Sequence, residues 1–319
     1  MPAARAACQS ARVSAPNRKV FDEVAGLATE QRNPRTMDLD RLATRAVLER
    51  INDEDQTVAA VVRGEIEHIE RAVDLAHAAI QAGGRVLYVG AGTSGRLGVL
   101  DAAECPPTFG TPPEWIQGII AGGYGALIQA VEGAEDREDD GAEQMRRARV
   151  EPKDFVLGIA ASRRTPFVVA ALKEARKLGA RTGLLTCTPR SEVTLDLDVA
   201  ICQVVGPEAI MGSTRMKAGT AQKLVLNMIS TATMVRFGKL YENMMVDLGA
   251  NSQKLIERGR RTLMTVTGLD YDKACIRLDE AGGHVKTAIV MTLAKTDRAN
   301  AEARLAKANG FVRGAIEGA

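Results

Sequence analysis

The sequence predicts an α/β fold, a parallel sheet flanked by helices, followed by a small helical C-terminal domain. Three observations support this prediction. Short apolar runs alternate with helix-like runs between residues 85 and 205, which is typical of a parallel sheet that is covered on both faces. The stretch GAGTSGRLG, residues 90–98, follows the first apolar run as a glycine-rich turn into a helix. Beyond about residue 251 only short helical patterns recur, with turn signals at glycines.

Residues 1–28 are expected to form a disordered leader. The first 20 residues are rich in Ala and Arg, contain no acidic residue and lack the apolar core of a secretory signal. An organelle transit peptide is the alternative that fits this composition. Residues 29–250 are then expected to form the main domain, and residues 251–319 the small helical domain.

A helical prelude is expected before the sheet. Between residues 38 and 82, apolar side chains recur at intervals of three and four, as at Ile66, Ile69 and Val73. Five buried strands are expected next, at residues 85–89, 116–120, 154–160, 182–187 and 199–205. The long amphipathic segment 217–240 is expected to pack across the sheet or against a partner subunit.

Composition excludes several classes of protein. The 42 basic and 40 acidic residues leave a formal charge of +2, and aromatic residues make up only 3%, so nucleic-acid binding is not expected. No apolar run approaches the roughly 18 residues that suggest a membrane span. Five cysteines form no CxxC pair and only three histidines are present, which predicts reduced thiols, a cytoplasmic location and no structural metal.

The glycine-rich turn fits a phosphate better than a dinucleotide. In dinucleotide-binding folds the second strand ends in an acidic residue that holds the ribose, but residues 116–123, IQGIIAGG, end without one. The turn places Thr93 and Ser94 at a helix start, where hydroxyls and free backbone N–H groups favour an anion. A second junction, ASRRT, places Ser162 and Thr165 directly after another apolar run. Helix capping is the alternative role of these hydroxyls.

Two glutamates are candidates for acid–base chemistry. Glu104 stands at the far end of the helix that the glycine turn begins, before a Pro-Pro pair that is expected to end this helix. Glu135 follows Glu132 by one helical turn, at the start of an acidic run. If Glu104 and Glu135 both reach one ligand, their environments can separate their pKa values into an acid and a base. The alternative is a structural role for each, and buried packing is the alternative to nucleophilic roles for Cys105 and Cys187.

Together these motifs resemble the N-acetylmuramic acid 6-phosphate etherases, a family built on a sugar isomerase (SIS) domain. The resemblance runs from about residue 29 to about residue 314 and rests on the blocks ECPPT, VEGAED and STRMKAGTAQK. It implies cleavage of the D-lactyl ether of N-acetylmuramic acid 6-phosphate, which yields N-acetylglucosamine 6-phosphate and D-lactate during recycling of cell-wall sugars. It implies no metal and no organic cofactor.

The resemblance also implies residue roles. Glu104 of ECPPT matches the general acid of the family, and Glu135, the second glutamate of VEGAED, matches the other catalytic carboxylate. The hydroxyls expected around the 6-phosphate are those of Thr93, Ser94, Ser162 and Thr165. The chain departs from the family pattern ASGRTP at Arg163, where the family has glycine, which puts the second phosphate loop in question.

A homodimer is expected, because one SIS domain leaves the apolar segment 217–240 to be covered and such domains commonly pair. Two other functions remain open at this point. One is a regulatory protein that senses a sugar phosphate without turnover, like the glucokinase regulatory protein. The other is an aldose–ketose isomerase on the same domain.

Overall fold

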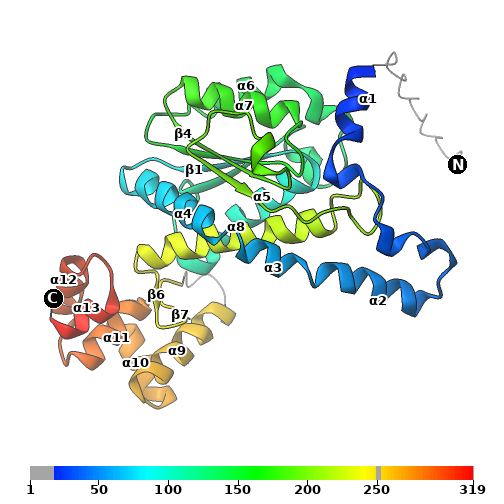
Figure 1. The fold of residues 1–319 in the computed structure, drawn as a ribbon. Helices are drawn as coiled ribbons and strands as arrows, with labels where there is room; N and C mark the ends of the chain where they lie inside the picture. The colour runs from blue at the N-terminus through cyan, green and yellow to red at the C-terminus, as the bar shows by residue number, and fades with distance from the viewer. Residues whose placement is uncertain (1–17, 249–252, 319) are drawn as a thin grey trace, which may run out of the picture.

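Five parallel strands form the central sheet of the protein, in the order β2-β1-β3-β4-β5. The computed structural model describes residues 18–248 and 253–318 (Figure 1). The strands are β1 Val86–Gly90, β2 Ile116–Ile120, β3 Phe155–Ile159, β4 Arg181–Thr186 and β5 Val199–Cys202. All neighbouring strands pair in parallel, so the predicted parallel sheet is confirmed.

Helices cover both faces of this sheet (Figure 1). The α-helices up to the end of the sheet region are α1 Arg18–Ala25, α2 Thr44–Asp55, α3 Val58–Arg63, α4 Ile66–Gln81, α5 Gly92–Phe109, α6 Glu138–Arg147, α7 Pro166–Lys177 and α8 Lys217–Arg236. Short 3₁₀ helices are η1 Ala28–Glu30, η2 Pro34–Thr36, η3 Leu39–Arg41, η4 Tyr124–Leu127, η5 Ala134–Asp136 and η6 Arg190–Glu192. The helices α6 and α7 cover one face, and α4, α5 and α8 cover the other.

The apolar character of β1 follows from this double cover. In β1, Val86 and Tyr88 pack into the core shared with α4, α5 and α8. Leu87 and Val89 point the other way, into the core shared with α6 and α7. Because both faces are buried, a strand here needs apolar residues at successive positions rather than at alternate ones.

The glycine-rich turn allows β1 and α5 to approach closely. A Cβ on Gly90 would lie 2.6 Å from the backbone nitrogen of Gly95, and a Cβ on Gly95 would lie 2.7 Å from the Gly90 carbonyl oxygen. Gly92 has a φ of +54°, a left-handed conformation that glycine adopts most easily. The three glycines therefore set the geometry with which α5 leaves the sheet.

Two predicted helix ends are wrong. The helix α5 continues through Pro106 and Pro107 and ends before Gly110, which has a left-handed φ of +60°. Proline already has a helical φ, so the pair fits in the last turn at the expense of two backbone hydrogen bonds. The helix α8 ends at Arg236, before the left-handed Gly238, and Leu240 instead begins a short hairpin.

The C-terminal part is a helical unit with its own core. Its α-helices are α9 Gln253–Thr267, α10 Tyr271–Glu280, α11 Val285–Leu293, α12 Arg298–Lys307 and α13 Val312–Glu317. The central helix α11 is buried at most positions, and the unit lies at one side of the sheet region (Figure 1). A hairpin of β6 Leu240–Tyr241 and β7 Met244–Met245 precedes it. The expected mainly helical region is confirmed.

The ends of the predicted domains are only partly described. The expected boundary at residues 250 and 251 falls outside the described residues, as do residues 1–17 of the expected leader. The last residues of that leader, from residue 18, are described as α1 and the start of η1. Leu27 is only 8% exposed, because its side chain packs against the main domain.

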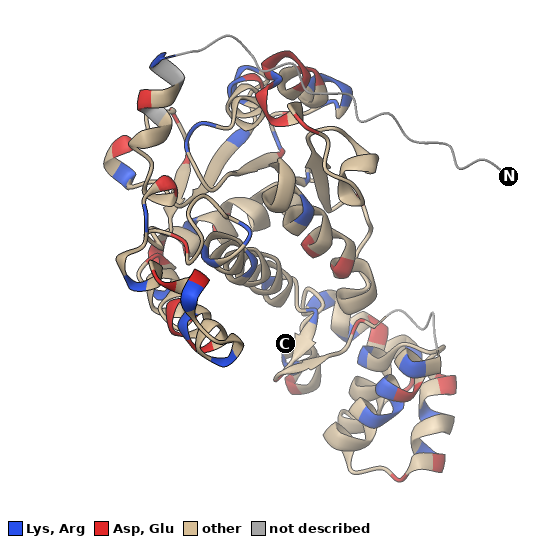
Figure 2. Ribbon diagram, turned by 90° about the vertical axis from the view of Figure 1, so that its right-hand side faces the viewer, with Lys and Arg blue, Asp and Glu red and all other residues tan. Residues whose placement is uncertain are grey.

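Charged residues of both signs are interspersed along the described ribbon (Figure 2). This distribution matches the small formal charge of +2. No helix within residues 18–248 or 253–318 is long and apolar enough to cross a membrane.

Candidate active site

A cleft of about 320 Å³ lies where the carboxyl ends of β1 and β3 meet. These two strands are neighbours, and the chain leaves them toward opposite sides of the sheet, since β2 lies beyond β1 and β4 beyond β3. Such a switch point is a common binding position in open α/β sheets. The lining includes Ala91, Gly92, Thr93, Ser94, Glu135, Asp136, Ser162, Arg164, Thr165, Gly212 and Thr214, together with Glu30 from the N-terminal segment.

The structure therefore brings together five of the six predicted site residues. Thr93 and Ser94 lie in the first turn of α5, while Ser162 and Thr165 lie in the turn between β3 and α7. Glu135, in η5, lines the same cleft. The glycine-rich turn and the second junction, ASRRT, therefore form neighbouring walls of one cavity.

The beginnings of α5 and α7 open toward this cleft without side-chain caps. Ala91 and Thr165 are the N-cap residues, and neither makes a side-chain cap hydrogen bond. Neither helix has an acidic residue in its first turn. The first backbone N–H groups of a helix have no partner within the helix and carry a partial positive charge. This arrangement favours anion binding over the alternative that the hydroxyls serve as caps.

Both serine hydroxyls of the cleft have hydrogen-bond partners within the chain. Ser94 Oγ donates a hydrogen bond to Gln222 Oε1 at 2.9 Å, and Ser94 is only 8% exposed. Ser162 Oγ accepts a hydrogen bond from the backbone nitrogen of Arg164 at 3.3 Å. The Arg164 side chain also lines the cleft and adds positive charge beside the two helix starts.

Glu135 lies among other acidic side chains. The residue is exposed overall, but partial burial of its carboxyl group raises its pKa above the ordinary value, and the negative charges of Asp136 and Glu132 raise it further. A carboxylate with a raised pKa binds a proton more strongly, which is what removal of a proton from carbon requires.

Glu104 lies outside this cleft. It follows Ser94 by ten residues on α5, a distance of about 15 Å along the helix axis. Its side chain is exposed. Asp101, three residues earlier, accepts a hydrogen bond from Asn227 of α8 at 2.7 Å, so this side of α5 lies against α8. The two predicted catalytic glutamates of one chain are therefore not brought together.

An open apolar groove adjoins that side of α5. It has a volume of about 780 Å³ and lies between α4 and α8. Its lining includes Ile66, Val73, Leu224, Met228 and Val235, together with Asn227. Leu100 of α5, one turn before Glu104, is also 54% exposed.

The cysteines do not support nucleophilic chemistry. Cys105 and Cys187 are both buried, and burial raises the pKa of each thiol to about 12. Thiolates are the reactive form, so both residues act in packing. Within the described part of the chain, no group of three or more His, Cys, Asp or Glu side chains is placed to hold a metal ion.

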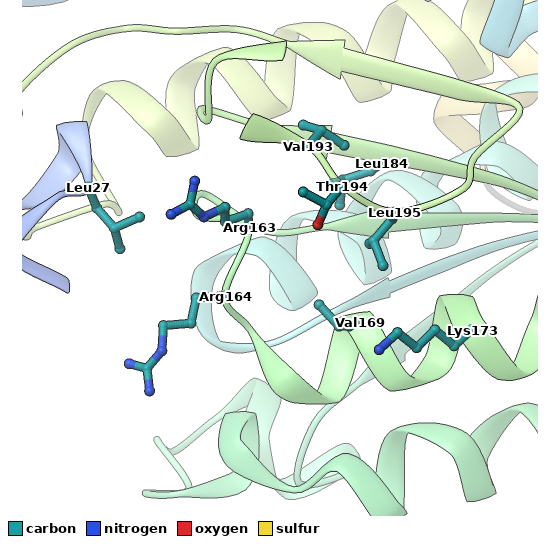
Figure 3. A pocket seen from close by; sticks show the side chains of 9 residues that line it. All are labelled: Leu27, Arg163, Arg164, Val169, Lys173, Leu184, Val193, Thr194 and Leu195. Carbon is teal, nitrogen blue, oxygen red and sulfur yellow. The ribbon is translucent and has the colours of Figure 1, made fainter. Parts of the chain in front are cut away.

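Arg163, the departure from the family pattern, is not among the residues that line the cleft. It lines a neighbouring hollow of about 280 Å³ with Arg164, Lys173 and Val193, as Figure 3 shows. Its guanidinium pairs with Glu192. The backbone of Arg163 does not have a positive φ, so the replacement of glycine introduces no left-handed strain.

Sequence reasoning missed the N-terminal wall of the cleft. The Thr29 carbonyl accepts a hydrogen bond from the Gly212 backbone nitrogen at 3.0 Å, which ties this wall to the loop before α8. Glu30 lies so close to Gly212 that a Cβ there would be 2.9 Å from Glu30 Oε2. The blocks TEQRNP and GSTRMK contain these residues, but nothing in their local pattern indicates that the two segments meet.

A buried ion pair links the start of α8 to α2. Lys217 Nζ lies 2.8 Å from Glu54 Oε2, and the two side chains are only 1% and 2% exposed. Arg35 donates to the same carboxylate. Glu208 accepts hydrogen bonds from the backbone nitrogens of Lys217 and Ala218 and so caps the start of α8 from the loop that leads into this helix.

Comparisons with known proteins agree with this architecture. The model of the glucokinase regulatory protein N-terminal SIS domain matches residues 68–176, and the SIS domain model matches residues 134–232. The chain is 57% identical to N-acetylmuramic acid 6-phosphate etherase from Salinibacter ruber, over 94% of this chain and 96% of the relative. It is 52% identical to the protein of the same name from a Geobacillus species, over 91% and 99% of the two chains.

The solved structure of a phosphoheptose isomerase from Francisella tularensis is more distantly similar. It has 18% sequence identity and a TM-score of 0.44, and the match covers 61% of this chain and 99% of the isomerase. The resemblance noted from the motifs is confirmed by the close relatives, which match this chain over nearly their whole length. The chain belongs to the N-acetylmuramic acid 6-phosphate etherase family.

Proposed function

We propose that the protein cleaves the D-lactyl ether of N-acetylmuramic acid 6-phosphate to N-acetylglucosamine 6-phosphate and D-lactate. The observation that carries this proposal is the cleft in which two helix starts, four hydroxyls and a carboxylate with a raised pKa converge. The 6-phosphate would lie against Thr93, Ser94, Ser162 and Thr165. The names of the close relatives support the choice of substrate.

The reaction needs only proton transfers once the sugar ring opens. The open form has an aldehyde at C1, which makes the proton on C2 removable. Glu135 takes this proton, the C3–O bond to the lactyl group breaks, and Glu104 gives a proton to the departing lactate oxygen. Water then adds at C3 of the unsaturated aldehyde, and a proton returns to C2. Each such transfer contributes about 10²- to 10⁴-fold to the rate.

The position of Glu104 leads us to place it in the cleft of a second copy. It is exposed and lies about 15 Å along α5 from Ser94. It also follows by three residues Asp101, which contacts Asn227 in the lining of the apolar groove between α4 and α8. A homodimer that covers this groove would remove apolar surface from water. It would also bring Glu104 of one subunit near the partner subunit.

We further propose that residues 29–250 form the sugar-phosphate domain, with residues 251–319 as a separate helical domain. The protein would act in the cytoplasm, in the recycling of cell-wall amino sugars. The family name supports this placement, as do the cysteines of the described part of the chain, which form no disulfide with one another.

The second candidate is a regulatory protein that binds a sugar phosphate without turnover. The match of residues 68–176 to the glucokinase regulatory protein domain favours it. An isomerase that uses the same C2 proton abstraction is the other enzymatic possibility.

One assay separates these functions. The purified protein is incubated with N-acetylmuramic acid 6-phosphate, and D-lactate is measured with time. Lactate release supports the etherase. Binding of the sugar phosphate without release supports the regulatory protein, and conversion of an aldose phosphate to a ketose phosphate supports the isomerase. Light scattering at micromolar concentration tests the dimer, and a monomeric mass would contradict it.

A further inference from the structure

Gln222 is a buried polar residue directly behind the cleft. It lies on α8 and is 1% exposed. Its Oε1 accepts the hydrogen bond from Ser94 Oγ at 2.9 Å, while its Nε2 has no hydrogen-bond partner within the described part of the chain. The Ser94 hydroxyl proton therefore points away from the cleft. A buried amide with an unsatisfied NH₂ group is also unfavourable.

Turning the amide exchanges these roles. The terminal torsion of glutamine is broad and close to two-fold, so Nε2 and Oε1 can change places with little movement of the side chain. Nε2 would then donate to Ser94 Oγ, and the hydroxyl proton of Ser94 would be free to point into the cleft. The atom left unpaired would be a carbonyl oxygen, which proteins tolerate better than an unpaired N–H.

We propose that Gln222 is a positioning residue for the substrate phosphate, whose amide turns when the phosphate binds. Nε2 then donates to Ser94 Oγ, and Ser94 donates to a phosphate oxygen. Hydrogen bonds in such a chain polarise and strengthen one another. The inference depends on the proposed function in one respect, that Ser94 contacts the phosphate.

The test compares a variant that keeps the Ser94 hydroxyl proton away from the cleft with one that leaves this hydroxyl free to turn. An ionised glutamate can only accept hydrogen bonds, so Gln222→Glu holds the Ser94 proton away from the cleft at a pH above the pKa of this carboxyl group, which burial raises. Gln222→Met has a similar shape and leaves the hydroxyl free. Affinities for inorganic phosphate and for N-acetylglucosamine 6-phosphate are measured by calorimetry, in the Ser94 protein and in the Ser94→Ala background.

Expected affinities follow from the strength of a hydrogen bond to a charged group. Ser94→Ala weakens binding about tenfold or more, and Gln222→Glu weakens it at least as much. Gln222→Met stays within about threefold of the wild type, because Ser94 keeps its donor. In the Ser94→Ala background, Gln222→Glu costs less than in the Ser94 protein, since only charge repulsion remains.

Gln203→Glu is the matched control for the added charge. Gln203 follows β5 and is fully buried, and its side-chain amide contacts the backbone of Ala221 and Gln222 on α8. Gln203→Glu should change the affinity equally in the Ser94 protein and in the Ser94→Ala background, because no contact joins Gln203 to Ser94 among the described residues.

Equal losses from Gln222→Glu in both backgrounds would overturn the inference and leave the phosphate cleft intact. If Ser94→Ala has no effect, the phosphate assignment itself fails.

A second readout uses folded wild-type protein labelled with ¹⁵N-glutamine. The side-chain NH₂ signal that disappears in Gln222→Met should shift when inorganic phosphate is added, and a signal that does not move would contradict the turn of the amide.

Discussion

The buried ion pair between Glu54 and Lys217 should make a large contribution to the stability of the cleft region. Glu54→Gln keeps the shape of the side chain but leaves the Lys217 ammonium, which is 1% exposed, without its counter-charge. Hydrogen bonds from Arg35 and then Lys217 lower the pKa of Glu54 from 4.5 to about 2 despite its burial. That difference corresponds to about 3 kcal/mol. Breaking a buried pair from one side costs about 3–5 kcal/mol, so a loss of about 3 kcal/mol is expected at pH 7.

The pH dependence has a definite sign. The folded pKa of Glu54 lies below its unfolded value, so the stabilisation is complete above about pH 4.5 and is lost as the pH falls toward 2. The difference between wild type and Glu54→Gln should therefore be constant from pH 7 to pH 5 and should shrink below that. Urea unfolding followed by circular dichroism measures it at each pH.

Glu49→Gln provides the control on the same helix, α2. Glu49 pairs with Arg45, and these side chains are 61% and 91% exposed. Such surface pairs contribute about 0–1 kcal/mol. If Glu54→Gln destabilises the protein no more than Glu49→Gln, or if its effect does not change below pH 5, the reasoning from burial is refuted.

Three further predictions concern the cleft. Ser94→Ala should weaken sugar-phosphate binding by about 1.5–3 kcal/mol, which is about tenfold or more, and Ser162→Ala should weaken it by about 0.5–3 kcal/mol. Calorimetry measures both losses, and equal turnover of unphosphorylated N-acetylmuramic acid would contradict the phosphate site. Glu104→Gln should still exchange the C2 proton of N-acetylglucosamine 6-phosphate in heavy water, but Glu135→Gln should not, because it lacks the base; the opposite NMR result would reverse the two roles. Arg163→Gly should leave KM within about twofold of wild type, since Arg163 is not part of the cleft lining, and a larger change would place Arg163 at the substrate.

Local patterns in the sequence predict the scaffold well because they reflect local physics. The run IQGII at 116–120 is short and mainly apolar, and its predicted bounds coincide with β2. The glycine-rich turn is equally local, because the close approach of Gly90 and Gly95 requires only five residues of chain. Helix ends were less predictable. Pro106 and Pro107 suggest a stop, but nothing in the sequence shows that α5 can include them in its last turn.

Contacts between distant segments could not be derived in this way. Glu30 and Gly212 are 182 positions apart and meet only because the N-terminal segment crosses the cleft. Gln222 carries no signal of its own within an amphipathic helix, yet its amide contacts Ser94 of α5. The motif resemblance suggests that Glu104 and Glu135 act together, whereas the fold of one chain separates Glu104 from the cleft. Tertiary packing decides each of these points.

That separation predicts complementation between two inactive variants. In a symmetric dimer whose clefts each take Glu104 from the partner subunit, Glu104→Gln and Glu135→Gln are both inactive alone. A mixed dimer has one cleft with an intact Glu135 from the first variant and an intact Glu104 from the second. When equal amounts of the two variants exchange subunits freely, about half of the dimers are mixed. Each mixed dimer has one working site of two, so about a quarter of wild-type lactate release should return.

The control is a mixture of Glu104→Gln with the double variant Glu104→Gln/Glu135→Gln, which has no intact Glu104 and should stay inactive. Subunit exchange is checked separately by mass spectrometry of differently tagged copies. If mixed dimers form and no lactate is released, Glu104 does not act across the subunits. Glu104 would then either reach its own cleft by a rearrangement of α5 or have no part in the chemistry. If it has no part, the Glu104→Gln variant should release lactate normally as well as exchange the C2 proton.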